Sequence, residues 1–354
     1  HEGNEGKKAS LLNNVGLAYQ DGNIYARAKK YLQSALEIRE RLASDNPTRF
    51  RADVAESQNN LGILYYEMNQ YAEAEQSYQV ALEVQERLAS DNPNRFEPDL
   101  AMTQNNLGLI YTDMNQYAKA ERYYLAALKT YERLVKDNPA NFESDLASTH
   151  NNLGVIYDKI DQYAKAEQSY IVALEIYERL ARDNPARFES DVAMTQDNLG
   201  LLNRDMNQYT KAKQYHLAAL KIYERLARDN PARFESDLAM TQNNLGLVYY
   251  DMNQYSETKQ YYLAALEIYE RLARDNPSRF ESSVAMSQHN LGNLYSNLNQ
   301  YANSEQSYLN ALAIRKRLAQ DNPIRFGLLR FCAIHEHWFN GILRSKRRWH
   351  AGSN

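Results

Sequence analysis

The sequence predicts an all-α fold: a right-handed α-solenoid of seven helix-pair repeats over residues 1–326, with a C-terminal capping helix in residues 327–354. One observation is a fixed interval of 46 residues, at which the tripeptide Asp-Asn-Pro and a glycine both recur without any insertion. A second is that small and apolar residues recur within each interval at spacings of three and four, the period of an α-helix. A fixed period of this kind marks a tandem array. The tripeptide begins at Asp45, Asp91, Asp137, Asp183, Asp229, Asp275 and Asp321, and the glycines are Gly16, Gly62, Gly108, Gly154, Gly200, Gly246 and Gly292.

The first half of each repeat is predicted to be a helix, here called helix A. In the third repeat, residues 97–117 read EPDLAMTQNNLGLIYTDMNQY, and Leu100, Leu107 and Tyr111 fall on one helical face. Pro98 is placed in the first turn of this helix, where its missing N–H costs nothing. The tetrapeptide MNQY then interrupts the helical pattern.

The second half of each repeat is predicted to be an antiparallel partner, helix B. In the third repeat it spans 118–139, with Ala120 and Tyr124 on the face towards helix A. Proline in Asp-Asn-Pro ends it, because proline lacks an N–H and pushes the preceding residue out of the α region. Gly108 and Ala120 have no bulk, so the two helices are expected to approach closely there. One pair cannot bury both of its apolar faces, which predicts stacking on the next pair.

The nonapeptide DNPARFESD occurs at 183–191 and again at 229–237, and we interpret it as the joint between repeats. Pro185 would end one helix, and a short turn would follow in which Phe188 fills the gap between neighbouring repeats. Glu189 and Asp191 would then lie near the positive N-terminal end of the next helix.

The repeat also resembles a known family. Its pattern is Gln104, Leu107, Gly108 and Tyr111, followed by Ala120, Tyr124 and Ala127. This pattern resembles the tetratricopeptide repeat, although glutamine replaces the usual tryptophan and the unit is longer than the usual ~34 residues. The extended unit is similar to the repeats of kinesin light chains and their prokaryotic relatives over residues 9–326.

The resemblance implies a scaffold that binds an extended peptide or protein segment in a concave groove lined by the A helices. Chaperone-binding members of the family hold a terminal carboxylate with lysine and arginine. Here the corresponding positions carry Asn59, Asn105, Asn151 and Leu109, so no such clamp is expected.

Composition excludes several other classes of function. The 41 basic and 45 acidic residues give a formal charge of −4, and this balance does not favour a nucleic-acid partner. No apolar run approaches the ~18 residues of a membrane span. The single cysteine excludes an internal disulfide framework and favours a reducing, cytoplasmic compartment. The chain offers no Gly-rich phosphate loop and no nucleophile beside a base, so neither catalysis nor a cofactor is expected.

The candidate binding surface is the side of helix A that faces away from helix B. An asparagine occupies one position of this side in all seven repeats, although asparagine is a poor helix former. Its amide can both donate to and accept from the backbone of an extended peptide. The alternative is that it bonds a neighbouring helix or persists from duplication. The row comprises Asn14, Asn60, Asn106, Asn152, Asn198, Asn244 and Asn290.

Three further rows accompany the asparagines. The methionines offer an adaptable surface for varied partners, and they are Met102, Met194, Met240 and Met286. An acidic row would favour partners with basic residues or form a solvated face, and it includes Asp21, Glu67, Asp113, Asp205 and Asp251. An apolar row is either a contact surface or partly buried between adjacent A helices, and it comprises Ile63, Leu109, Val155, Leu201 and Leu247.

The repeat pattern stops after residue 326. Apolar residues of the tail keep helical spacing, which predicts a helix that caps the seventh repeat; they include Leu328, Phe331, Trp338, Phe339 and Ile342. His335 and His337 would diverge by ~200° on a helix, so they do not form a helical zinc pair. The basic stretch 344–350 would meet an acidic partner or lie in solvent.

Two functions of other classes stay open beside the peptide-binding scaffold. The first repeat lacks the Asp-Asn-Pro lead-in, which suggests a sensory or regulatory module of a larger protein. Open-ended repeats also suggest a structural spacer or an array that self-associates end to end.

Overall fold

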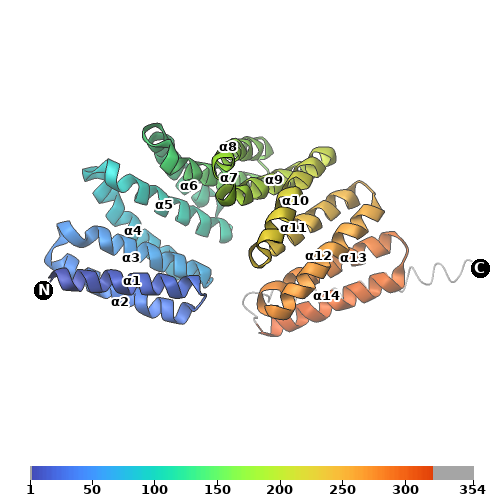
Figure 1. Ribbon diagram of the computed structural model, residues 1–354, viewed down its shortest axis with the longest axis horizontal. Coiled ribbons are helices and arrows are strands. Elements are labelled where there is room, and N and C mark those ends of the chain that lie inside the picture. Colours follow the sequence, from blue (N-terminus) through green and yellow to red (C-terminus); the bar gives the residue numbers. More distant parts are fainter. Residues whose placement is uncertain (1, 322–354) are drawn as a thin grey trace, which may run out of the picture. The chain divides into compact units, whose positions relative to one another are not determined.

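The computed structural model describes residues 2–321, which form fourteen α-helices and contain no strand. Odd-numbered helices are the A helices and even-numbered helices are the B helices (Figure 1). The A helices are α1 (Glu2–Asp21), α3 (Pro47–Glu67), α5 (Pro93–Asp113), α7 (Pro139–Lys159), α9 (Pro185–Asp205), α11 (Pro231–Asp251) and α13 (Pro277–Asn297). The B helices are α2 (Tyr25–Asp45), α4 (Tyr71–Asp91), α6 (Tyr117–Asp137), α8 (Tyr163–Asp183), α10 (Tyr209–Asp229), α12 (Tyr255–Asp275) and α14 (Tyr301–Asp321). The expected array of seven helix pairs is confirmed, and the tail predicted to form a cap lies outside the described residues.

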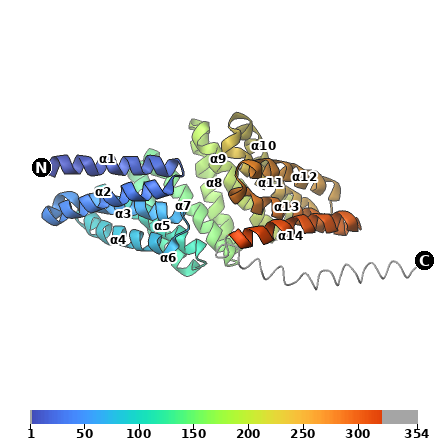
Figure 2. The same cartoon turned by 90° about the horizontal axis from the view of Figure 1, so that it is seen from below.

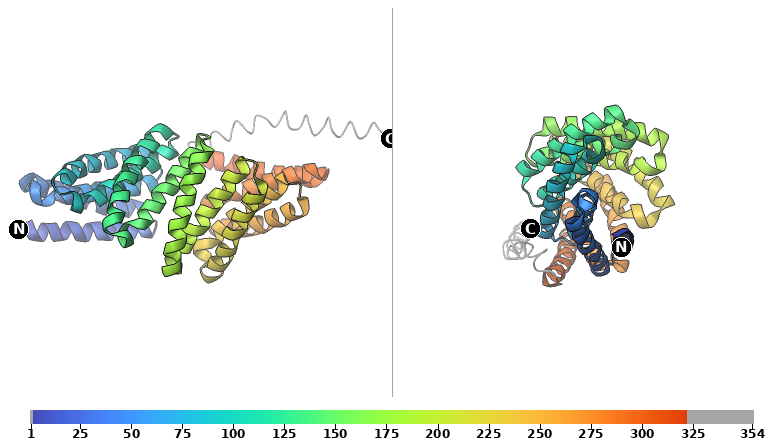
Figure 3. Two further views of the ribbon diagram at one scale, coloured as in Figure 1. Left: turned by 90° about the horizontal axis from the view of Figure 1, so that it is seen from above. Right: turned by 90° about the vertical axis from the view of Figure 1, so that its left-hand side faces the viewer.

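The chain divides into two compact blocks, one ending at Phe188 and the other beginning at Glu189. In the first block, each helix from α1 to α8 contacts the next one along the chain. In the second block, the same holds from α10 to α14. Figures 2 and 3 show this order of neighbours from other directions. Helices α2, α4, α6 and α12 therefore each pack between their own A helix and the A helix that follows.

The joint between repeats is shorter than the sequence predicts. Proline begins each of α3, α5, α7, α9, α11 and α13, so a single asparagine separates each B helix from the next A helix. The expectation of a short turn after Pro185 was therefore wrong: α9 begins at this residue. Proline is well placed at the first helical position, since its fixed φ suits the helix and its missing N–H has no helical partner there. Because α5 begins at Pro93, Pro98 lies inside this helix and not in its first turn.

Glu189 also has a different role from the one predicted. Because α9 begins at Pro185, this carboxylate lies in the second turn, where it forms an ion pair with Arg225 of α10. The same pairing of helix A with helix B recurs in other repeats, for example between Glu143 and Arg179 at 2.9 Å. The ion pair therefore links helix A to helix B of the same repeat near the N-terminus of helix A.

The turn between helix A and helix B depends on one left-handed residue. Its φ is +56° at Asn115, and the equivalent asparagine or aspartate has a φ between +56° and +59° in all seven repeats. The Asn115 side-chain oxygen also accepts a hydrogen bond of 2.7 Å from the Tyr117 hydroxyl. Asparagine tolerates this conformation better than other residues with a side chain.

Asn115→Ala should lower the free energy of unfolding by about 1–2 kcal/mol, because alanine is strained at positive φ. Asn115→Gly should cost much less, because glycine adopts this conformation freely. Urea unfolding followed by circular dichroism measures both variants. Equal losses for alanine and glycine would mean that the hydrogen bond to Tyr117, and not backbone strain, decides stability here.

The helices of a pair meet where the recurrent glycine faces helix B. A Cβ atom on Gly108 would lie 2.5 Å from Cε1 of Tyr124, so the tyrosine ring occupies the space that any side chain would need. The equivalent ring lies against Gly62, Gly154 and Gly246, and His216 takes its place against Gly200. The glycine is therefore required because the opposite residue is large, and not because both helices are small at this point.

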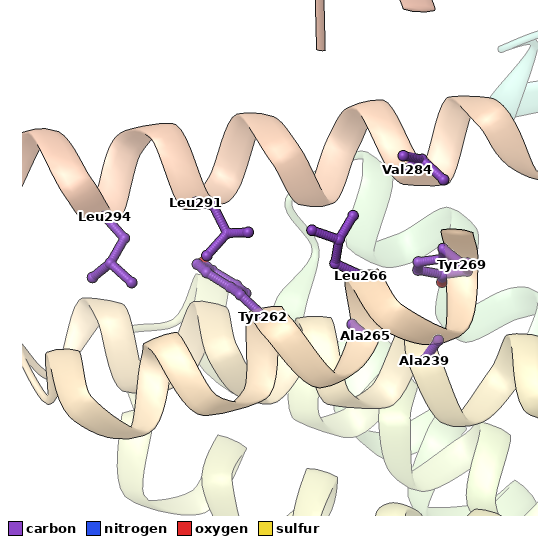
Figure 4. Close-up of a cluster of buried hydrophobic side chains, with 8 residues drawn as sticks. All are labelled: Ala239, Tyr262, Ala265, Leu266, Tyr269, Val284, Leu291 and Leu294. Atoms are coloured by element: carbon purple, nitrogen blue, oxygen red, sulfur yellow. The ribbon is translucent and has the colours of Figure 1, made fainter. Parts of the chain in front are cut away.

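The apolar core continues from one pair into the next. Figure 4 shows Tyr262 of α12 facing Leu291 of α13, with Val284 of α13 close to Tyr269 of α12. Phe234, the counterpart of Phe188 in the next joint, is buried in a cluster with Ala219 and Tyr223. The expectation that this phenylalanine fills the gap between neighbouring pairs is confirmed at Phe234.

Candidate interaction surface on the A helices

One face of each A helix carries the residues that the sequence singles out for binding. In α5 the stripe runs from Met102 through Asn106 and Leu109 to Asp113, at spacings of three and four. Met102 and Asp113 are exposed, whereas Asn106 and Leu109 are half-buried. The stripe is thus an accessible surface whose ends are more exposed than its middle.

The same stripe is present in α11. Met240 is exposed, and Asn244, Leu247 and Asp251 are half-buried. The whole apolar row that includes Leu109 and Leu247 is half-buried wherever it occurs, which agrees with partial burial between neighbouring A helices.

The asparagine row joins neighbouring A helices. The Asn106 amide nitrogen donates to the side-chain oxygen of Asn59 at 3.4 Å, and Asn152 donates to Asn105 at 3.4 Å. The same bond links Asn60 to Asn13 at 3.1 Å and Asn290 to Asn243 at 3.2 Å. Each bond uses one of the two N–H groups of the donating amide. Bonding to a neighbouring helix, one of the two interpretations of the sequence, is therefore observed for these four residues.

The asparagine hydrogen bonds between neighbouring A helices are called the seam, and threonines add further bonds to it. Thr103 donates to the Asn59 oxygen at 3.2 Å, and Thr149 donates to the Asn105 oxygen at 3.3 Å. The positions of Asn59 and Asn105 are called inner, and those of the asparagine row, one residue later, are called outer. Each of these inner asparagines accepts two hydrogen bonds from the next A helix. Asn198 and Asn244 lie at the outer position in α9 and α11 and are half-buried.

Asn59→Ala should destabilise the first block by about 1–3 kcal/mol, because buried Thr103 and half-buried Asn106 lose their common acceptor. Urea unfolding measures the loss. Asn14→Ala is the matched control, since this outer-row residue is exposed on α1. A loss at Asn59 no larger than that at Asn14 would contradict a stabilising seam.

The acidic row also has partners on the preceding A helix. Asp113 accepts a 2.6 Å hydrogen bond from the Tyr66 hydroxyl, and Asp251 accepts one of 2.6 Å from Nε of Arg204. Burial, together with the bond to Asp113, raises the pKa of Tyr66 well above its usual value. Asp205 is exposed, with a carboxylate oxygen 4.0 Å from Nη1 of Arg204. The partner of Asp113 is therefore an uncharged hydroxyl, whereas the partner of Asp251 is a guanidinium.

A second acidic row was missed by the sequence analysis. An aspartate stands three residues before Met102, Met194 and Met240, on the same helical face, and at the equivalent place in α3 and α7. The row comprises Asp53, Asp99, Asp145, Asp191 and Asp237. Burial raises the pKa values of Asp99, Asp145 and Asp237, and nearby arginines only partly oppose this effect. The repeat interval contained the signal, because this aspartate recurs as regularly as the acidic row at the other end of the stripe.

The fifth repeat departs from the others in its interior. Asp197 replaces the inner asparagine and His216 replaces the tyrosine, and Nδ1 of His216 lies 2.7 Å from a carboxylate oxygen of Asp197. His216 is 0% exposed and Asp197 is 3% exposed. The other carboxylate oxygen accepts a hydrogen bond from Thr241, so the threonine link to the next A helix is kept. These two exchanges replace a neutral pair by a buried acid–base pair.

Between residues 2 and 321, no cluster of three or more histidine, cysteine or acidic residues has a geometry that could hold a metal ion. None of the fourteen helices combines the length and the apolar character that crossing a bilayer requires.

Comparison with known families decides the classification. Tetratricopeptide repeat profiles match residues 7–87 and 99–179, and a second profile of the same description matches 192–232, 238–278 and 284–324. The chain belongs to the tetratricopeptide repeat family. No curated protein matches this tetratricopeptide array.

Solved structures share its fold. BtubC (BKLC) from P. vanneervenii is 26% identical, with a TM-score of 0.56 over 71% of this chain and 92% of that one. The apo form of RapI is 18% identical, with a TM-score of 0.64 over 88% and 99%. The Rap conjugation gene regulator of plasmid pLS20, solved with a Phr peptide, is 17% identical, with a TM-score of 0.53 over 88% and 74%. The likeness to BtubC agrees with the kinesin-light-chain type of repeat.

Proposed function

We propose that this tetratricopeptide array is a non-enzymatic scaffold that holds an extended segment of another protein along the exposed face of its A helices. The contact residues would come from the methionine, asparagine and acidic rows. They are Met102, Met194, Met240, Asn60, Asn106, Asn152, Asn198, Asn244, Asn290, Asp113, Asp205 and Asp251.

The exposed methionine row carries this proposal. Met102 is 39% exposed and Met240 is 43% exposed, although each is a large apolar side chain on a helix that is otherwise well packed. Rows of uncovered apolar residues are typical of interaction sites. Methionine is flexible and polarisable, so it adapts to side chains of different shapes.

The asparagines support the proposal in a secondary way. Each donating amide of these hydrogen bonds has a second N–H group, and the outer asparagines of α3 to α13 are half-buried beside the methionine row. These groups offer hydrogen bonds to a peptide backbone without selecting its side chains. Among the structures of similar fold, one regulator was solved with a bound peptide.

The B helices provide a matched control surface. Leu125 of α6 is 43% exposed and Leu263 of α12 is 41% exposed, so these residues equal Met102 and Met240 in accessibility but lie on the other helix of the pair. The experiment compares the native chain, Met102→Gln with Met240→Gln, and Leu125→Gln with Leu263→Gln. Partners are captured from a lysate of the source cells and quantified by mass spectrometry, after circular dichroism has shown that all three chains are folded.

We expect the methionine variant to lose a partner that both the native chain and the leucine variant retain. Affinity for that partner should fall at least about tenfold, because two apolar contacts are lost. Loss by the leucine variant alone would place the site on the B helices and contradict the proposal. Retention by all three chains would also contradict it.

A further inference from the structure

We propose that the segment held by the A helices is basic, with lysine or arginine side chains opposite two rows of carboxylates. One row lies beside the methionine row and the other lies at the opposite end of the stripe. This inference rests on the proposed function and names the chemistry of its partner.

The carboxylates bracket the candidate surface at both ends. In α5, Asp99 precedes Met102 by three residues and Asp113 follows it by eleven, and all three share one helical face. In α11, Asp237 and Asp251 hold the same places around the methionine. Two more A helices carry an acid at both ends of the stripe: Asp53 and Glu67 in α3, and Asp191 and Asp205 in α9. These eight residues are the bracketing carboxylates.

Not every A helix has a carboxylate at both ends of the stripe. In α7 one end is Lys159, and in α13 both ends are neutral, Ser283 and Asn297. The negative charge is therefore concentrated on α3, α5, α9 and α11. Within one block, a segment with basic residues opposite α3 and α5, or opposite α9 and α11, would be favoured over one of uniform charge.

In the aspartate row beside the methionines, Asp99 and Asp237 keep raised pKa values although arginines lie near them. Arg95 lies one helical turn before Asp99, but its guanidinium is 4.9 Å from the ring centre of Phe96, and Asp99 keeps a raised pKa because burial outweighs the arginine. At Asp237 the pKa is also raised, by burial and by the charge of Asp197, against the opposing effect of Arg233 and Arg279. A carboxylate that is partly desolvated in this way is stabilised by an added cation.

In the acidic row at the other end of the stripe, Asp113 of the first block and Asp251 of the second block have different partners. Asp113 accepts from a neutral tyrosine hydroxyl, so its charge is available to a partner. Asp251 is already bound by Arg204. Basic residues of a partner should therefore gain more at Asp113 than at Asp251.

The repeat geometry also sets the spacing of the basic residues. Packed helix axes are ~8–10 Å apart, and an extended chain advances ~3.3 Å per residue. Neighbouring A helices are therefore about three residues of an extended partner apart. We expect basic and apolar residues to recur at roughly that interval.

The test uses a displayed library of random dodecapeptides selected against the full chain. A parallel selection uses Asp99→Asn, Asp113→Asn and Asp237→Asn together, which removes three charges while keeping similar side-chain shapes. The control is Glu86→Gln, Glu178→Gln and Glu270→Gln, which makes the same change in net charge at exposed B-helix positions. A fourth selection uses the chain with Met102→Gln and Met240→Gln.

We expect the native chain and the glutamate control to enrich peptides rich in lysine and arginine. The aspartate variant should bind those peptides up to about fivefold more weakly for each charge removed, and added salt should weaken native binding. Peptides that require the methionines but show no basic bias would overturn this inference and leave the proposed function standing. If no enriched peptide depended on the methionines, both would fail.

Discussion

Asp197→Ala should destabilise the second block by about 3 kcal/mol, the largest loss that we expect from a single polar residue in this chain. The substitution leaves the fully buried imidazole of His216 without the carboxylate that lies 2.7 Å from its Nδ1. It also removes the acceptor of the Thr241 hydroxyl. Urea unfolding gives the size of the loss, and hydrogen exchange of the peptides around residues 197 and 216 shows where the structure opens.

The control restores the residues of the other repeats. Asp197→Asn with His216→Tyr recreates the asparagine and tyrosine found at Asn105 and Tyr124. Replacing a buried pair of titratable groups by a neutral pair is often neutral or stabilising, so the double variant should be at least as stable as the native chain. A double variant less stable than Asp197→Ala would contradict this account of the fifth repeat.

Gly108→Ala should cost about 1–3 kcal/mol, although alanine is the better helix former. The new Cβ atom would lie 2.5 Å from Cε1 of Tyr124, a ring that is buried and cannot swing aside without moving α6. Thermal unfolding should show the loss, and hydrogen exchange should place it in α5 and α6.

Gly6→Ala is the matched control for this substitution. The nearest atom to its new Cβ would be Cε1 of Phe50 at 3.6 Å, an ordinary contact. This variant should be neutral or more stable by up to about 1 kcal/mol, since glycine is unfavourable within a helix. Equal effects at the two glycines would mean that helix propensity, and not the contact with Tyr124, decides both.

The helix pairs were predictable because their signal is repeated in each interval. The spacing of Leu107, Tyr111 and Tyr124 identified both helices, and the asparagine of MNQY marked the turn between them. The start of helix A was predicted too late, because proline can either end a helix or begin one, and only the chain geometry around Pro93 distinguishes these roles.

The candidate surface was only partly predictable. A helical wheel places Asn106 on the side of α5 away from α6, but it does not give the rotation of the preceding A helix. The bond from Asn106 to Asn59 depends on that rotation. The aspartate row that includes Asp99 could have been found from the sequence, since it keeps the same interval and lies three residues before Met102.

The same asparagine-to-asparagine hydrogen bond joins four pairs of neighbouring A helices. Every inner asparagine that accepts from the following A helix belongs to a helix whose outer position is itself an asparagine. Where both positions are asparagine, donor and acceptor are the same from one helix to the next, so an added copy of such a repeat would form the same bonds with its neighbours. Asp197 in α9 and His289 in α13 are exceptions to this pattern. Duplication of one such repeat would therefore lengthen the array by one helix pair while keeping the hydrogen bonds between A helices.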